Sequence, residues 1–171
     1  SGTVVCWGYE MASGITRTKP YTTIFSNWHA YAGLTVTGKL EAWGGSNFGG
    51  ITPTIPADAR VVRVFSSNSA FAALLNDGSL VCWGNQNNGG ECNRNPAVKD
   101  KVKSGVRFVA ATAFAMVAVK EDGTAAVWGD KHFGADFTAV RDDLSGIISI
   151  ESGFRQFAAL CSGGRVVQWS G

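Results

Sequence analysis

The sequence predicts an all-β fold of about four repeated units, each built from three strands. Tryptophan followed by a small residue recurs at intervals of 36 to 45 residues. The segment 25–44 aligns without a gap over the segment 65–84, and a glycine-containing pair stands at matching places in four copies. Repeats of this length are typical of supersecondary units that stack or are arranged radially. We therefore expect an array in which each unit buries its apolar face against its neighbours.

A hairpin is predicted at the centre of each unit. The strand "AFAALL" (70–75) is small and apolar, and "SLVCW" (79–83) leads back to a tryptophan. Between them stands Asp77-Gly78, a pair that suits a type I′ turn because both of its central positions need a positive φ. The four predicted turns are Thr37-Gly38, Asp77-Gly78, Asp122-Gly123 and Gly163-Gly164.

A third strand precedes each hairpin, because segments such as "RVVRVF" (60–65) and "IISIES" (147–152) are rich in β-branched residues and partly alternate. The longer connections around Val98/Val102 and Val140/Leu144 have i,i+4 spacing, which predicts one short helical turn in each. We predict a single repeat domain over residues 1–171, with units at about 2–37, 38–77, 78–122 and 123–163 and a terminal return strand at 164–171. The return strand at 2–8 has no hairpin partner of its own. It either closes a ring with another unit, or the chain is part of a longer array.

The stretch "AFAALLNDGSLVCWGNQNNGG" (70–90) resembles the signature of the RCC1 (regulator of chromosome condensation) family. That signature is a small apolar strand, an Asp-Gly turn, a strand ending in Trp-Gly, and a tail with repeated glycines. The resemblance covers four complete units and implies a β-propeller-like array. Two features depart from the family's pattern, since the repeats are shorter than usual and four units stand where the reference propeller has seven. The short WG-rich style is more similar to divergent RCC1-like repeats predicted in some unicellular algae.

Repeat positions are interpreted as packing and turn positions. The tryptophans are expected to pack between units, and the turn glycines to reverse the chain at no steric cost. These positions are Trp7, Trp43, Trp83, Trp128, Trp169, Gly38, Gly78, Gly123 and Gly164. The four cysteines, Cys6, Cys82, Cys92 and Cys161, lack the spacing of a zinc site and are interpreted as small half-buried residues. A disulfide stays open, since connectivity cannot be read from sequence.

Motifs of catalysis are missing from the sequence. It contains no nucleophile elbow, phosphate loop, H-E-x-x-H or EF-hand pattern. His29 and His132 are the only groups that titrate near neutral pH, and both are replaced by Ser or Asn in other copies, as surface positions would be. Asp77 and Asp122 are explained by the turns. We therefore expect no catalytic, cofactor-binding or metal-binding residue, and no enzyme activity.

Composition narrows the class of partner. The 15 basic and 13 acidic residues are interspersed and give a net charge of +2, without the basic run of a nucleic-acid binder. No apolar stretch is long enough to span a membrane. Charged residues make up only 16%, below the usual share of about 25%, so part of the surface is expected to be covered by another protein.

Partner-contact candidates come from the loops, which differ between copies while the hairpins stay alike. They are Phe48, Phe133, His132, Asn87 and Trp28. We expect a non-catalytic repeat scaffold that contacts other protein subunits. The algal style of the repeats sharpens this to a peripheral subunit docked on a photosynthetic membrane complex, in the chloroplast at the thylakoid. The alternatives are a guanine-nucleotide exchange factor for a small GTPase, implied by the family resemblance, and a carbohydrate-binding propeller.

Overall fold

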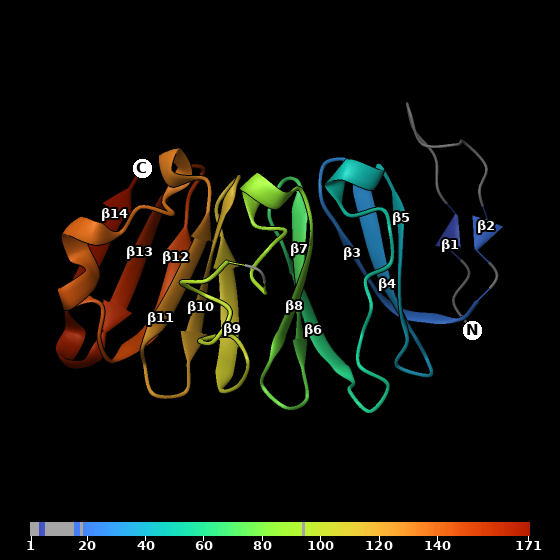
Figure 1. The fold of residues 1–171 in the computed structure, drawn as a ribbon, viewed down its shortest axis with the longest axis horizontal. Helices are drawn as coiled ribbons and strands as arrows, with labels where there is room; N and C mark the ends of the chain where they lie inside the picture. Colours follow the sequence, from blue (N-terminus) through green and yellow to red (C-terminus); the bar gives the residue numbers. More distant parts are fainter. Residues whose placement is uncertain (1–3, 6–15, 18, 94) are drawn as a thin grey trace.

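The structure is a computed structural model that describes residues 4–5, 16–17, 19–93 and 95–171. Four three-stranded antiparallel sheets lie side by side in chain order (Figure 1). We call them the first to the fourth unit. This arrangement confirms the predicted all-β repeat fold with three strands in each unit. Trp7 and Cys6 lie outside the described residues.

In each unit the strand that comes second in the sequence is also the central strand of the sheet. The first unit contains β3 (Tyr21–Ser26), β4 (Ala30–Thr35) and β5 (Leu40–Gly44), and the second contains β6 (Val61–Ser66), β7 (Ala70–Leu75) and β8 (Leu80–Gly84). The third contains β9 (Val106–Ala111), β10 (Ala115–Lys120) and β11 (Ala125–Gly129), and the fourth contains β12 (Ile147–Ser152), β13 (Gln156–Cys161) and β14 (Val166–Ser170). A separate pair, β1 (Val4–Val5) and β2 (Thr16–Arg17), is antiparallel.

The predicted unit boundaries fall at the turns inside these sheets rather than between them. The first sheet runs from 21 to 44, so a boundary at 37/38 separates β5 from its partner β4. The predicted units and the observed sheets have the same repeat period, and they differ only in the residue at which each repeat begins. The assignment of the whole chain to one domain stays a prediction.

All four hairpins turn where the sequence places them, but the turn type differs from the prediction. In the second unit Gly78 N–H donates to Leu75 O at 3.0 Å, and Leu75 N–H donates to Ser79 O at 2.9 Å. The loop therefore has three residues, 76–78, with the positive φ of 77° at Gly78 as its last residue. This is a type I turn followed by a left-handed glycine, so the type I′ turn predicted for Asp77-Gly78 is wrong. In the fourth unit the short 3₁₀ segment η5 (Ser162–Gly164) joins β13 to β14, with positive φ at both glycines.

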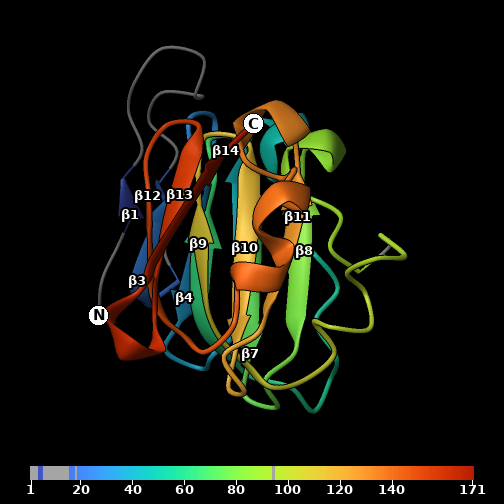
Figure 2. The ribbon, with the colours of Figure 1, turned by 90° about the vertical axis from the view of Figure 1, so that its left-hand side faces the viewer.

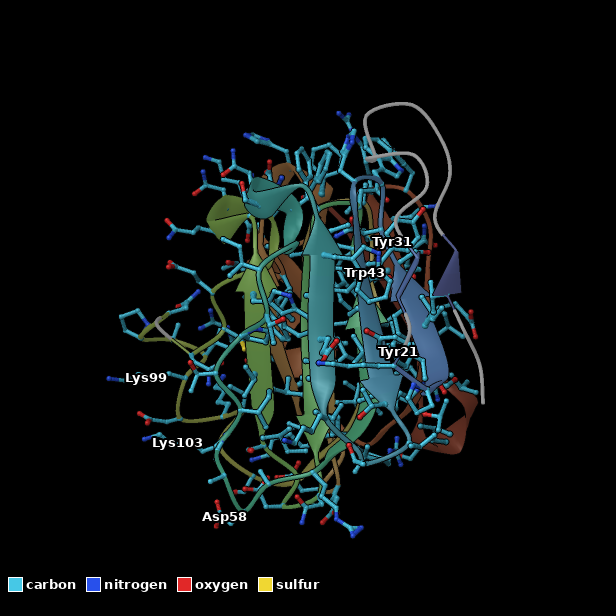
Figure 3. All side chains as sticks on the ribbon, turned by 90° about the vertical axis from the view of Figure 1, so that its right-hand side faces the viewer. Tyr21, Tyr31, Trp43, Asp58, Lys99 and Lys103 are labelled. Atoms are coloured by element: carbon cyan, nitrogen blue, oxygen red, sulfur yellow. A yellow bond between two sulfur atoms is a disulfide. The ribbon has the colours of Figure 1, made fainter. Side chains whose placement is uncertain are left out.

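The core lies between the sheets. All six residues of β7 are buried, because a neighbouring unit covers each face of its sheet. The small side chains of this strand, among them Ala70 and Ala72, allow the sheets to approach closely. Two faces buried at once explain why "AFAALL" shows no alternation. On the first sheet, Tyr21, Tyr31 and Trp43 group together and contact Val4 of β1 (Figure 3).

Tryptophans tie each unit to the one before it. Trp83 Nε1 donates to Gly49 O, Trp128 Nε1 to Gly89 O, and Trp169 Nε1 to Gly134 O, each at 2.9 Å. The accepting carbonyls belong to equivalent loop positions of the preceding units. Trp43, Trp83, Trp128 and Trp169 are all buried.

The two predicted helical turns lie in the connections after the second and third units. Residues 138–143 form the 3₁₀ helix η4 (Thr138–Asp143). Around residue 98 the chain makes turns in which Val102 N–H donates to Val98 O at 3.2 Å. Val98 and Val102 are both buried against the core between the second and third units. Both connections are thus held by apolar side chains, as the i,i+4 spacing indicates.

A disulfide joins Cys82 on β8 to Cys92 in the connection that follows, with a Cα–Cα distance of 5.6 Å. This settles the disulfide that the sequence left open, and Cys82 is half-buried, as expected. The sequence could not show the pairing, because the nine intervening residues had to fold back along β8 before the two sulfurs met. Cys161 is free and buried. None of the helices in the described part of the chain combines the length and apolar composition that a membrane crossing requires.

Candidate functional site

Most of the sequence-predicted contact residues lie at one end of the array. The third strand of each of the first three units runs into a short 3₁₀ helix: η1 (Ser46–Phe48), η2 (Gln86–Asn88) and η3 (Lys131–Phe133). These helices stand at the upper end of the sheets in Figure 1. The turns that join the first and second strands of each unit lie at the same end, because Ala30 after the turn pairs with Gly44 before η1. We call this surface the end face.

Backbone hydrogen bonds connect the turns of the end face from unit to unit. Trp28 N–H donates to Asn68 O at 3.2 Å, Asn68 N–H to Ala113 O at 2.9 Å, and Ala113 N–H to Phe154 O at 3.1 Å. These four residues hold the same position in the four units. The turns are thereby fixed relative to one another, which makes the end face one continuous surface.

A polar residue in each of the first three turns holds the turn against the 3₁₀ helix beside it. Asn27 Nδ2 donates to Phe48 O at 2.7 Å, Ser67 Oγ to Asn88 O at 3.1 Å, and Thr112 Oγ1 to Phe133 O at 2.7 Å. The same side chains accept the backbone N–H of the residue that opens the next strand, such as Ala30. Three different residue types perform this task, so the sequence gives no obvious motif for it.

The glycine of each Trp-Gly pair lets the chain leave the sheet beside the turn. Gly44 has a φ of 106°, and a Cβ on it would lie 2.5 Å from His29 O. Only glycine has both the left-handed conformation and the space that this approach demands. The Trp-Gly pair therefore combines a residue that packs between units with one that brings the 3₁₀ helix against the turn.

Aromatic side chains from the first, third and fourth units gather on the end face. Phe133 lies at the centre, with ring centroids 4.6 Å from Phe114 and 5.8 Å from Phe154 in edge-to-face arrangements. Trp28 contacts Phe114 edge-on at 6.1 Å, and the Arg155 guanidinium lies 4.6 Å over the Phe133 ring. We call these five residues the aromatic cluster.

Two members of the aromatic cluster are largely open to solvent. Trp28 is 61% exposed and Phe154 is 60% exposed. Large apolar side chains that are contiguous and exposed mark interaction surfaces, and Trp and Arg are enriched among the residues that contribute most to protein binding. The cluster thus has the chemistry of a protein-binding surface.

The structure places the other predicted contact residues on the same end face but outside the cluster. Asn87 and His132 are both exposed. The backbone N–H of Asn87 donates to Asn85 Oδ1, and that of His132 donates to Asp130 Oδ1. Phe48 is half-buried and contacts His29, with ring centroids 4.2 Å apart. Of the five predicted residues, the structure brings Trp28 and Phe133 together in the cluster.

Sequence reasoning missed Phe114, Phe154 and Arg155. A signal was available, because Trp28 and Phe154 share one repeat position and Phe114 and Arg155 share the next, directly before the second strand of each unit. Aligning the copies at that turn, rather than at the loop after Trp-Gly, finds the aromatic pair.

Charged groups with shifted pKa values lie away from the aromatic cluster. The hydroxyl of Thr124 and its backbone N–H lower the pKa of Asp122 in the hairpin turn, and Ser79 lowers the pKa of Asp77 in the same way. A hydrogen bond from Thr138 lowers the pKa of Asp136. Within the described residues, no three His, Cys, Asp or Glu side chains gather as a metal site requires. The shifted carboxylates therefore serve turns and loops.

Several solved structures share this fold. No protein-family model matches the chain, and no curated protein matches it either. The CRINKLY WD40 ectodomain of the Arabidopsis thaliana receptor kinase ACR4 matches with a TM-score of 0.61 at 18% identity, over 98% of this chain and 56% of that one. Yeast RCC1 (Prp20), solved bound to Kap60, matches with a TM-score of 0.59 at 16% identity, over 86% of this chain and 43% of that one. Human WBSCR16 matches with a TM-score of 0.58 at 18% identity, over 90% and 48%.

The chain thus spans about half the length of the propellers that it matches. At this level of identity the likeness shows the fold alone. It agrees with the sequence resemblance and with the four observed sheets. The chain has an RCC1-like, β-propeller-like repeat fold.

Proposed function

We propose that the chain is a non-catalytic repeat scaffold that binds another protein through the aromatic cluster of its end face. The observation that carries this proposal is the exposure of Trp28 and Phe154 in the aromatic cluster, with Arg155 lying over the central Phe133 ring. The hydrogen-bonded turns beneath fix the backbone that carries these side chains, so this surface loses little conformational freedom when a partner binds.

The structural neighbours support a role in protein binding. Yeast RCC1 was solved in complex with Kap60. Prp20p from Saccharomyces cerevisiae was described with its binding to Gsp1p and histones. These partners belong to those proteins, and the partner of this chain is proposed here only as a protein with an apolar contact surface.

The narrower expectations do not gain support from the comparisons. The solved structures named above are a receptor ectodomain, yeast RCC1 and human WBSCR16, and their names do not refer to a photosynthetic complex. A chloroplast location likewise stays a prediction. Exchange-factor activity and carbohydrate binding stay as the alternatives that the sequence left open, and no observation in the structure favours either.

Site-specific photo-crosslinking tests the proposal. A photoreactive phenylalanine analogue replaces Phe154, and the purified chain is incubated with native extract, irradiated and separated on a gel. We expect a discrete crosslinked protein that disappears when an excess of the unlabelled wild-type chain is added. The double variant Trp28→Ala/Phe154→Ala should fail as competitor, because truncating central anchors costs roughly 2 kcal/mol or more each.

Val62 provides the matched control, because it is about as exposed as Phe154 but lies on β6, away from the end face. The same analogue at position 62 should give no crosslinked protein that disappears when unlabelled wild-type chain is added. The Val62→Ala variant should compete as well as the wild type does. Equal competition by the Trp28→Ala/Phe154→Ala variant would show that binding does not use the aromatic cluster.

A further inference from the structure

The third strand of each unit is an edge strand, and its outward backbone groups need partners. In the first unit Ala42 N–H donates to Thr52 Oγ1 at 2.8 Å. In the second unit Leu80 N–H donates to Val102 O at 2.9 Å, and Leu80 O accepts from Asn93 Nδ2 at 3.0 Å. The connection that follows each of these units thus folds back and covers its edge.

The third unit lacks such cover. Ala125 and Val127 on β11 hold the positions equivalent to Leu80 and to Ala42, respectively. Ala125 lies opposite Val119, and Val127 lies opposite Val117. Both are non-hydrogen-bonded pairs of the antiparallel hairpin, in which the N–H and C=O groups do not bond to the partner strand. The N–H and C=O groups of Ala125 and Val127 therefore point away from β10, to the open side of β11. Across residues 4–5, 16–17, 19–93 and 95–171, no group makes a hydrogen bond to these outward atoms.

Burial makes this edge unusual. Val127 is 7% exposed as a whole residue and Ala125 is half-buried, so the surroundings partly enclose this edge. An unpaired and partly enclosed edge is a template for another strand. The site therefore calls for a partner with backbone donors and acceptors of its own.

A groove runs beside this edge. It has a volume of about 370 Å³, and its lining is formed by Ala97, Lys101, Thr124, Ala125, Val127, Phe137, Arg141 and Leu144. Ala97 and Lys101 belong to the connection before the third unit, and Phe137, Arg141 and Leu144 belong to the connection after it. Figure 2 shows η4, in orange, in front of the sheets on the side of the fourth unit, and η4 supplies Arg141 to the lining. An extended segment placed along β11 would have its alternate side chains facing the two connections.

The groove carries two positive charges. Among the described residues neither Lys101 nor Arg141 forms an ion pair, whereas Lys103 on the same connection is paired with Asp100 at 2.7 Å. The Arg141 guanidinium lies 5.3 Å over the Phe137 ring, which orients it at the apolar wall. The chemistry of the site thus combines backbone pairing, an apolar surface and attraction for carboxylates.

We propose that this groove binds an extended acidic peptide segment, which adds to β11 as a fourth strand of the third sheet. Propeller blades typically have four strands, and strand addition to an exposed edge is a common way to recognise peptides. Backbone pairing with Ala125 and Val127 supplies affinity, while Lys101 and Arg141 select acidic side chains. This surface is separate from the end face, so the inference does not depend on the function proposed above.

The experiment uses the full chain and a fluorescein-labelled hexapeptide of sequence Glu-Glu-Val-Val-Glu-Glu, which places glutamate on both faces of the added strand. Binding is followed by fluorescence anisotropy, and the amide signals of Ala125 and Val127 are followed by NMR hydrogen exchange. We expect saturable binding that weakens with salt, together with slower exchange at both amides. A peptide N-methylated at alternate residues should bind at least about tenfold more weakly, because it cannot pair with the edge.

Variants separate the edge from the charges. Lys101→Glu and Arg141→Glu should each weaken binding by about tenfold, while Lys103→Glu should bind like the wild type. Ala125→Pro removes an outward N–H and spares the hairpin bonds, so it should abolish the protection of Val127. A thermal melt of each variant checks that it is folded, and the charge-reversal variants test the groove even if Ala125→Pro does not fold.

Three outcomes would overturn the proposal. One is unchanged exchange at Ala125 and Val127 when the peptide is bound. Another is equal binding by Lys101→Glu, Arg141→Glu and the wild type. The third is equal affinity for free glutamate and for the hexapeptide, which would show a simple anion site without strand pairing.

Discussion

At the scale of the single residue, the tryptophans link packing to backbone hydrogen bonding. Trp83 stacks on Phe71, with ring centroids 5.1 Å apart, and its indole N–H reaches Gly49 O of the preceding unit. We expect Trp83→Ala to lower the free energy of unfolding by about 3–5 kcal/mol, through the cavity and the lost contacts. Urea denaturation followed by circular dichroism measures this loss.

Two companion variants define what the indole contributes. Trp83→Phe keeps an aromatic ring but loses the N–H donor, so its loss should be smaller than that of Trp83→Ala. Trp28→Ala should change stability by no more than about 0.5 kcal/mol, because Trp28 is largely exposed. If Trp83→Ala were as stable as the wild type, Trp83 would not serve as a packing residue.

The turn aspartates predict how stability depends on pH. Hydrogen bonds from Thr124 lower the pKa of Asp122 below its ordinary value. A carboxylate with a lowered folded-state pKa contributes stability that is present above the unfolded-state pKa of about 3.9 and is lost as pH falls through the folded value. Asp122→Asn should therefore be less stable than the wild type at pH 7, and the difference should shrink below about pH 4. Urea denaturation at a series of pH values tests this, and a gap that widens in acid would contradict it.

At the scale of the element, the structure separates two kinds of glycine. Gly38 and Gly44 both have positive φ, but a Cβ on Gly38 would meet no atom within 4 Å, whereas one on Gly44 would lie 2.5 Å from His29 O. Gly38→Ala should therefore cost only the backbone strain, about 1–3 kcal/mol. Gly44→Ala should cost more, because β5 must shift away from the turn. Paired denaturation curves decide this, and equal losses would mean that the close approach of β5 to the turn is not a constraint.

The disulfide holds the connection after the second unit against β8. Reduction, or the double variant Cys82→Ser/Cys92→Ser, should lower the free energy of unfolding by about 2–3 kcal/mol, as expected for a closed loop of this short length. Cys161→Ser controls for the loss of a thiol outside the disulfide. Equal melting temperatures with and without reductant would show that the disulfide does not stabilise the fold.

Elements within a unit were predictable from the sequence, while contacts between segments were not. The hairpins follow from local turn residues and from the repeat, which supplies four copies of the same pattern. The turn type was missed because the glycine serves as the last loop residue, with the aspartate before it accepting from the backbone two residues on. The Cys82–Cys92 bond and the bare edge at Val127 depend on how the connections fold back, which varies from copy to copy. The cluster around Phe133 was found in part, because the three missed members, Phe114, Phe154 and Arg155, lie in the turns before the second strands rather than in the loops after Trp-Gly.

At the scale of the whole molecule, the turns of the end face join the units into one structure. The amides of Asn68 and Ala113 lie in loops but donate to carbonyls of the next unit. We expect both to exchange with solvent as slowly as amides of the middle strands, because they open only when neighbouring units separate. Native-state hydrogen exchange measures this directly. Rapid exchange at Ala113 with slow exchange in β10 would show that the units open independently.

The same row of turn hydrogen bonds has a geometric consequence for the array. It draws neighbouring units to hydrogen-bond distance at the margin of the first strands, where β3, β6, β9 and β12 approach one another. At the opposite margin the bulky indoles of the third strands hold the units apart, since face-to-face sheets pack about 10 Å from each other. Each unit is therefore a wedge that is thin on one side and thick on the other. A row of such wedges cannot run straight, so the array must curve around the margin of the first strands, with a radius set by the size of the indole side chain.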